Sequence, residues 1–235
     1  RSLMNYLFLG TGVGDLDESV NYRCGFTEFI KKNYQPKDNI FLVEANKKHI
    51  QKLKECWKNF QNINIFNIAI ARNNEDEGIK KFYYSKESAP HYQTCSMHVE
   101  HVIKHYPNDK NIQSFKVNAI SINKFINKYL KNERIDYCSI DLEGIDFEVI
   151  MSLNLADFDI KKISIEFQHM HMKQIRGMIK KFNKNSYSYK GYGYDHFNLD
   201  FLFEKKVIRL NQFLSIILGY TRSKKIRHLI NYLIN

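Results

Sequence analysis

Cysteine, proline and glycine are all scarce in this 235-residue chain, which contains four, three and ten of them respectively. So few prolines and glycines exclude a collagen-like or proline-rich linker architecture. The four cysteines lie far apart and form no CxxC pair or Cys/His cluster, which argues against a zinc site and against a disulfide framework. Free thiols are typical of a reducing compartment, so we expect a cytoplasmic protein.

Long apolar runs are absent as well. The longest, around residues 213–220, is well short of the roughly 20 residues that span a bilayer. Hydrophobic residues still make up 43% of the chain, enough apolar area to offset the ordering entropy of one compact domain. Acidic residues are outnumbered, 25 against 36 Lys and Arg, which gives a net charge of +11. A charge of this sign invites a nucleic-acid or anionic-membrane partner.

Short apolar runs alternate with helical patterns along most of the chain. This alternation predicts an α/β fold of the Rossmann-like type, with a mostly parallel sheet and helices on both faces. Residues 85–111 have no clear apolar pattern and predict a long loop. The expected strands are 6–9, 40–43, 63–71, 80–84, 137–140, 163–165 and 199–204, and the expected helices lie around 26–30, 50–60, 122–130, 147–153 and 175–182.

The positive charge is concentrated near the C-terminus. Residues 201–235 contain seven Lys and Arg against one Glu, so more than half of the net charge lies there. We therefore expect a domain over residues 1–208 and a helical extension over residues 209–235. The extension is basic and amphipathic, and it predicts either contact with an anionic membrane surface or packing on the domain or on a second subunit.

Carboxylates follow the predicted strands at most of their carboxyl ends. In an open α/β sheet, ligands bind at these ends, where the strand order reverses. Strand propensity alone does not place acidic residues there, so this edge of the sheet is the expected site. The segments at the strand ends are Gly10 to Asp15, Glu44, Ala69, Asp141 to Glu143, and Glu166.

The first strand ends in a G-x-G-x-G turn, formed by Gly10, Gly12 and Gly14. Glycines let a ligand approach the backbone closely, although any tight glycine turn would give the same pattern. Glu44 at the end of the second strand is placed to accept the two hydroxyls of a ribose. The alternative for Glu44 is a solvated charge at a strand end. Together the two features favour a ligand that contains adenosine.

Several of these strand-end stretches resemble motifs of the FkbM-type methyltransferase family. The most specific match is IDYCSIDLEG at residues 135–144, which resembles the signature stretch at the family's fourth strand. The resemblance covers roughly residues 6–205. One departure is Phe8, at a position where the family usually has an acidic residue. The other matching stretches are GTGVGD (10–15), VEAN (43–46), NIA (67–69), FEVI (147–150) and ISIE (163–166).

The resemblance implies a class I methyltransferase fold and S-adenosylmethionine as the cofactor. It also implies methyl transfer to an acceptor, most often a hydroxyl on a sugar or glycan-type small molecule. The residues expected to bind the cofactor are Gly10, Thr11, Gly12, Gly14, Glu44, Ala45, Asn46, Ala69 and Asp141.

A sugar hydroxyl is a poor nucleophile, so we expect a base or a metal ion near the transferred methyl group. The catalytic candidates at this edge are Asp141, Glu143, Glu166 and His169. Asp141, Glu166 and His169 would also suit a divalent cation such as Mg²⁺. Asp141 and Glu143 could instead form a turn that caps the next helix, and His169 could be a surface or packing histidine.

Acceptor binding is expected from the long central loop and from a tyrosine-rich tract near residue 190. The candidates are His91, Tyr92 and Tyr194, although an edge strand and hairpin explain that tract equally well. Two rival functions stay open: RNA methylation, and a non-catalytic nucleotide-binding module of the same fold. No arginine-rich stripe lies near the motifs, so the sequence favours a small-molecule or glycan acceptor over nucleic acid.

Overall fold

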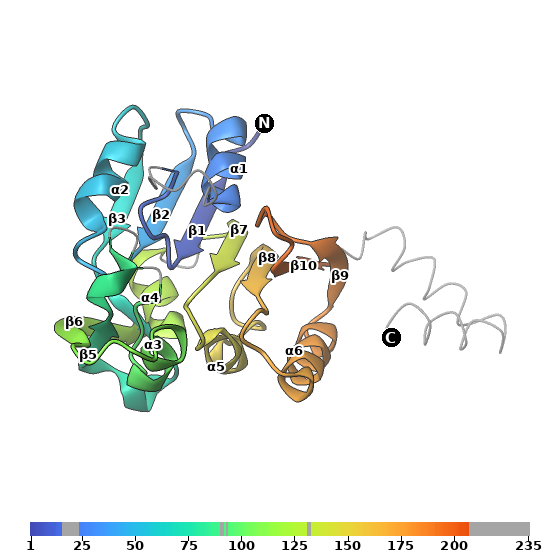
Figure 1. Cartoon of the computed structure of the whole chain (residues 1–235). Coiled ribbons are helices and arrows are strands. Elements are labelled where there is room, and N and C mark those ends of the chain that lie inside the picture. The colour runs from blue at the N-terminus through green and yellow to red at the C-terminus, as the bar shows by residue number, and fades with distance from the viewer. Residues whose placement is uncertain (16–23, 90–91, 93, 131–132, 207–235) are drawn as a thin grey trace, which may run out of the picture.

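The computed structural model describes residues 1–15, 24–89, 92, 94–130 and 133–206 (Figure 1). The proposed extension over residues 209–235, with its membrane or self-association role and the domain boundary at residue 208, lies outside the described residues. None of the helices in the described ranges is both long and apolar enough to cross a membrane.

Within the described residues, seven strands form one sheet in the order β3-β2-β1-β7-β8-β10-β9. β10 runs antiparallel to both of its neighbours, and the pairs from β3 to β8 are all parallel. The expected Rossmann-like α/β fold with a mostly parallel sheet is therefore confirmed. The strands are β1 (Asn5–Leu9), β2 (Asn39–Val43), β3 (Ile63–Phe66), β7 (Ile135–Ile140), β8 (Ile160–Glu166), β9 (Tyr187–Tyr192) and β10 (Asp200–Lys205).

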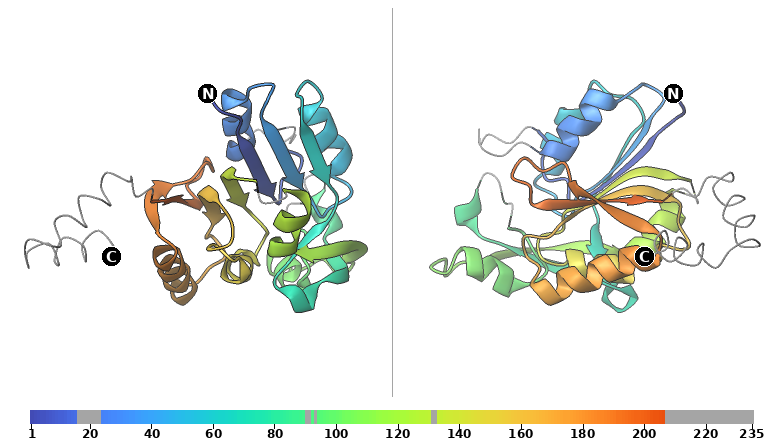
Figure 2. Two further views of the ribbon diagram at one scale, coloured as in Figure 1. Left: turned by 180° about the vertical axis from the view of Figure 1, so that it is seen from behind. Right: turned by 90° about the vertical axis from the view of Figure 1, so that its right-hand side faces the viewer.

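Apolar side chains alternate between the two faces of this sheet, and each face has its own core. Tyr6 and Phe8 of β1 pack toward α1 and α2, whereas Leu7 and Leu9 pack toward α4, α5 and α6. In the right-hand view of Figure 2, α1 and α6 lie on opposite sides of the sheet. The helices are α1 (Gly25–Asn33), α2 (Ile50–Trp57), α3 (Val99–His105), α4 (Ile122–Tyr129), α5 (Asp146–Ser152) and α6 (Met172–Lys184), with short 3-10 turns at Asn74–Asp76 and Lys86–Ser88.

A second sheet, which the sequence pattern does not reveal, joins β4 (Ala69–Ala71), β6 (Gln113–Ser121) and β5 (Gly78–Tyr84). The single strand expected over residues 63–71 is wrong, because the chain leaves the large sheet after Phe66 and enters the small one at Ala69. The long loop expected over residues 85–111 is also wrong in part, because α3 lies within it. α3 buries only Val102, too little to produce an apolar periodicity.

A buried hydrogen bond joins β8 to β10. Ser164 Oγ donates to Asp200 Oδ2 at 2.9 Å, and both side chains are buried. Gly193 leaves room for the pair, since a Cβ at that position would lie 2.2 Å from Ser164 Oγ. Burial raises the pKa of Asp200 to about 6, against the opposing effect of the Ser164 bond. Above that pH the sheet contains an ionised carboxylate whose burial opposes folding.

Asp200→Asn is expected to stabilise the fold in a pH-dependent way. The folded chain binds the Asp200 proton more tightly than the unfolded chain, so wild-type stability falls as pH rises from about 4 to 6. The variant keeps an acceptor for Ser164 and removes the cost of burying an ionised carboxylate. Its free energy of unfolding should exceed that of the wild type by about 3 kcal/mol above pH 6 and should equal it near pH 4.

Chemical denaturation of both proteins from pH 4 to 8 measures the difference. Asp157→Asn, at an exposed position, is the matched control and should show no such trend. A stability difference that does not change with pH would contradict the burial of an ionised Asp200.

Candidate active site

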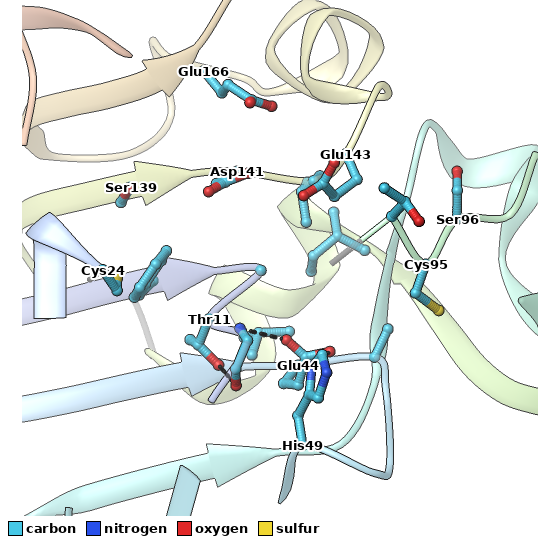
Figure 3. Close-up of a pocket in the computed structure, with 18 of the residues that line it drawn as sticks. Thr11, Cys24, Glu44, His49, Cys95, Ser96, Ser139, Asp141, Glu143 and Glu166 are labelled. Carbon is cyan, nitrogen blue, oxygen red and sulfur yellow. Dashed lines mark hydrogen bonds and ion pairs between the residues drawn. The ribbon is translucent and has the colours of Figure 1, made fainter. Parts of the chain in front are cut away.

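A pocket of about 540 Å³ opens where β1, β2, β7 and β8 end. Figure 3 shows side chains from these strand ends gathered around it, among them Glu44, Asp141 and Glu166. Its other wall comes from β4 and from residues near Tyr92 and Ser96. The pocket therefore lies between the small sheet and the carboxyl edge of the large sheet. This is the edge at which the strand-end carboxylates predict a site.

The glycine turn after β1 forms the floor of the pocket. Gly10, Gly12 and Gly14 all have positive φ, at 83°, 54° and 70°. A Cβ on Gly10 would lie 1.6 Å from the carbonyl oxygen of Asp141, whereas a Cβ on Gly12 would meet nothing within 4 Å. Gly10 is thus required by the packing of the two strand ends. The open side of Gly12, which lines the pocket, leaves space for a ligand to approach the backbone.

Glu44 ties the end of β2 to the glycine turn. Its Oε2 accepts a hydrogen bond from the Gly12 amide at 2.7 Å, drawn as a dashed line in Figure 3. Its Oε1 accepts from the Asn46 amide at 2.6 Å. Oε1 also lies 3.5 Å from His49 Nδ1, so Oε2 is the oxygen of this buried carboxylate that keeps an acceptor position for a ribose hydroxyl. Asn46 lies beneath the pocket and supports Glu44, although it was expected to bind the cofactor itself.

The other residues expected to bind the cofactor lie around the same turn. Thr11 is buried, and its amide donates to the Val43 carbonyl at 3.3 Å. Ala45 and Ala69, after β2 and at the start of β4, line the pocket together with Asp141. The structure therefore brings together all the expected cofactor residues except Asn46 as lining groups.

The loop after β7 is held in an unusual shape by Asp146, the first residue of α5. The Asp146 carboxylate accepts from the Leu142 amide at 2.7 Å and from the Gly144 amide at 3.2 Å. Glu143 between them has a φ of 50°, a left-handed conformation that a residue with a side chain adopts at a cost. The alternative expectation was that Asp141 and Glu143 cap the next helix, but the residue at the N-cap of α5 is Ile145 and no side chain bonds there. The turn directs Glu143 into the pocket.

Three of the catalytic candidates are carboxylic acids in very different electrostatic surroundings. Burial, reinforced by the nearby charge of Glu143, raises the pKa of Asp141 well above its usual value. Burial and the charge of Asp141 raise the pKa of Glu166 to about 12. Burial also opposes ionisation of Glu143, but His101 and His169 outweigh it and lower its pKa. Glu143 is therefore the one of the three whose surroundings favour the ionised form.

Three histidines lie beside Glu143. Nε2 of His101 and Nε2 of His169 each lie 3.6 Å from Glu143 Oε2, and His105 packs beside them. Burial and the two neighbouring imidazoles lower the pKa of His105. In the described residues these three histidines are the group whose ligand atoms could share one ion, so of the expected trio Asp141, Glu166 and His169 only His169 belongs to it. The missed signal was an H-x-x-x-H pair, His101 and His105, in a segment interpreted as a loop.

The acceptor candidates have different outcomes. Tyr92 lines the pocket, and the Lys48 ammonium lies 4.3 Å from its ring centroid. His91 lies outside the described residues. Tyr194 does not line the pocket: its ring stacks on Phe29 at 4.1 Å, in the aromatic core under α1. The structure therefore places Tyr194 outside the pocket lining, and its acceptor role stays a prediction.

The Methyltransferase FkbM domain model matches residues 12–195 of the sequence. The chain belongs to the FkbM methyltransferase family. The match spans the glycine turn from Gly12 onward, Glu44 and the loop after β7, so it includes much of the pocket lining. No curated protein matches the sequence.

Solved structures of other methyltransferases are similar at low identity. Fibrillarin of Aeropyrum pernix, in complex with natively bound S-adenosyl-L-methionine, is 13% identical, with a TM-score of 0.43 over 87% of this chain and 66% of that one. The human methyltransferase 10 domain containing protein is 8% identical, with a TM-score of 0.45 over 86% and 71%. An rRNA methylase from Streptococcus thermophilus is 9% identical, with a TM-score of 0.40 over 87% and 88%. The family assignment rests on the domain model.

This FkbM-family chain departs from the family pattern at Phe8, whose buried ring packs edge-on against Phe26 at 5.1 Å. Asp15 does not replace the missing acid, because its carboxylate bonds Lys31 at 2.8 Å and Cys56 at 3.0 Å and does not line the pocket.

Other carboxylates do line the pocket. In the described part of the chain, the lining contains six acids and no Lys or Arg. These acids are Glu44, Asp141, Glu143, Glu166, Asp195 and Asp200.

Alanine substitutions at Gly10 and Gly12 should separate folding from ligand binding. Gly10→Ala places a methyl group against the Asp141 carbonyl and should lower the free energy of unfolding by about 3 kcal/mol. Gly12→Ala meets open space and should cost only about 1 kcal/mol for its left-handed backbone. It should nevertheless weaken binding of S-adenosylmethionine at least tenfold.

Denaturant melts and isothermal titration measure the two effects. Gly78→Ala, where the added Cβ also meets open space at positive φ but far from the pocket lining, is the control for backbone strain. Undiminished binding by the Gly12 variant would exclude a ligand against this turn.

Proposed function

We propose that this chain transfers a methyl group from S-adenosylmethionine to a hydroxyl of a sugar or glycan-type small molecule. The observation that carries the proposal is the pocket itself. It joins a ribose-binding half, built from the glycine turn and Glu44, to an acidic half built from Asp141, Glu143 and Glu166. An acidic lining suits a cationic methyl donor and a neutral polyhydroxylated acceptor.

The ribose-binding half fits the cofactor on two observations. The space beside Gly12 is open, and the Glu44 carboxylate is buried at the pocket wall with an acceptor position left on Oε2. Asp141, at the end of β7, lies next to Gly10 and can face the positive charge of the donor. When bound, S-adenosylmethionine supplies a methyl carbon that its sulfonium makes electrophilic. The bound S-adenosyl-L-methionine of the fibrillarin structure supports the same choice of cofactor.

In this proposal, Glu143 is the base that receives the acceptor's proton. Its pKa is lowered by His101 and His169, so it is ionised at neutral pH, whereas the raised pKa values of Asp141 and Glu166 favour their protonated forms. Asp146 fixes the loop that points Glu143 into the pocket. Holding both reactants at near-attack distance can supply about 7–11 kcal/mol of the barrier reduction.

RNA is the less favoured acceptor, despite the chain's net charge of +11. A nucleic-acid groove is lined by Lys and Arg that neutralise phosphates. No Lys or Arg lines this pocket in the part of the chain that the structure describes, so the pocket lacks the cations that neutralise a phosphate backbone. All four cysteines are free thiols, which supports a reducing compartment such as the cytoplasm.

Glu44→Gln tests the cofactor half. The variant retains the shape of the side chain but loses its charge and one acceptor oxygen, so a charged hydrogen bond worth about 1.5–3 kcal/mol is lost. Isothermal titration with S-adenosylmethionine should show binding weakened by roughly 10- to 100-fold. Glu133→Gln, at an exposed position before β7, is the matched control and should bind as the wild type does. Equal binding by both variants would refute the role of Glu44.

A methyl-transfer screen with labelled donor tests the acceptor half. Sugars, sugar nucleotides, glycans and RNA are compared at equal hydroxyl concentration, with Glu143→Gln beside the wild type. We expect label in a sugar-type acceptor and a loss of at least 100-fold in kcat for the variant, because general-base catalysis contributes about 10²–10⁴-fold. Label in RNA alone would overturn the acceptor assignment and leave the methyltransferase assignment intact.

A further inference from the structure

Two segments far apart in the sequence bring three imidazoles together at one wall of the pocket. His101 and His105 lie one turn apart on α3, and His169 follows β8. Ligand nitrogens of the three lie within 4.8 Å of one another. We propose that His101, His105 and His169 bind a divalent transition-metal ion, with Glu143 beside it.

An orphaned nitrogen at the centre of the cluster points to a missing partner. Nε2 of His101 is buried and has no hydrogen-bond partner within the described residues. The nearest carboxylate oxygen, Glu143 Oε2, lies 3.6 Å away, beyond hydrogen-bond reach. Buried polar atoms are nearly always satisfied, so an unsatisfied imidazole nitrogen that faces two further imidazoles is the arrangement an ion would complete.

The loop after β7 is shaped around this cluster. A Cβ on Gly144 would lie 3.1 Å from His101 Nδ1, so the glycine lets the loop backbone pack against the imidazole. Glu143, held at a φ of 50°, has one carboxylate oxygen 3.6 Å from both His101 and His169. A carboxylate in that position offsets the charge of an ion and orients the imidazoles that hold it. The left-handed conformation of Glu143 thus places its carboxylate beside the histidine cluster.

The donor set selects the class of ion. Imidazole nitrogens suit Zn²⁺, Fe²⁺, Ni²⁺ and Cu²⁺, whereas Mg²⁺ prefers oxygen ligands and keeps several waters. This differs from the Mg²⁺ expected at Asp141, Glu166 and His169. Three protein ligands leave a coordination position open. Zinc–nitrogen bonds of about 2.0–2.1 Å place the nitrogens of one site closer together than 4.8 Å, so binding requires the imidazoles to move inward.

The position of the cluster links it to catalysis, and this part of the inference rests on the proposed function. His105, His169 and Glu143 all line the pocket. The open coordination position can hold the acceptor oxygen and lower the pKa of its hydroxyl, as zinc does for bound water. The proton then moves to the Glu143 carboxylate and the oxygen forms a bond to the methyl carbon. The carbon–sulfur bond breaks with its electron pair left on sulfur.

Metal binding is tested on the full chain after treatment with a chelator and its removal. Zn²⁺ is titrated in competition with a chromophoric chelator, and Co²⁺ gives an absorption spectrum that reports imidazole coordination. We expect one ion per chain, and binding weakened at least tenfold in His105→Ala, whose side chain is exposed and whose loss should leave folding intact. His98→Ala, just before α3 and outside the cluster, is the matched control and should bind as wild type. No binding by the wild type, or equal binding by His105→Ala and His98→Ala, would overturn the proposal.

A second pair of measurements separates this inference from the proposed function. Titration of the metal-free chain with S-adenosylmethionine should give the wild-type affinity in both histidine variants, because the cluster lies outside the ribose-binding half. Methyl transfer should fall at least 100-fold with chelator and return with added Zn²⁺. Transfer that is indifferent to chelator overturns the catalytic role of the ion, whereas tight metal binding without transfer to any acceptor supports the site and counts against the proposed function alone.

Discussion

The contact between Gly10 and the carbonyl of Asp141 determines how the two functional loops meet. The ends of β1 and β7 approach so closely that a Cβ on Gly10 would lie 1.6 Å from that oxygen. The glycine turn and the loop after β7 are thereby fixed side by side. Glu44 then attaches the end of β2 to the turn, and Asp146 shapes the β7 loop. Glu44 and Glu143 therefore line one pocket on either side of this close approach.

Acids crowded into one pocket interact strongly with one another. Burial and mutual repulsion raise the pKa values of Asp141 and Glu166, whereas the pKa of Glu143, beside the imidazoles, is lowered. Separation of pKa values among neighbouring groups is the usual way in which a site assigns different roles to residues of one type. Here the asymmetry comes from the imidazoles: Nε2 of His101 and Nε2 of His169 each lie 3.6 Å from Glu143, whereas Glu166 has His169 at 4.0 Å.

The large sheet and its edge were predictable because buried parallel strands are short apolar runs and each run ends abruptly at a polar residue. Glu44, Asp141 and Glu166 could be placed at one edge on that basis alone. The small sheet was predicted only in part: the expected strand over residues 80–84 lies in β5, but β6 was not expected although its buried residues alternate with exposed ones, and α3 buries only Val102. The histidine cluster was not predicted because two of its members, His101 and His105, lie on α3, in a segment interpreted as a loop. Cysteine spacing, which argues against a zinc site, says nothing about a site built from histidines.

The small sheet has a hydrophobic core of its own, formed by Ala69, Phe82 and Val117 with two further alanines, separate from the two cores of the large sheet. One wall of the pocket is therefore carried by a sheet with its own core, joined to the large sheet through Ile70 of β4. Substitutions among the residues of that small core can reshape this wall while Glu44 keeps its bonds to Gly12 and Asn46. The two sides of the pocket can in this sense vary separately.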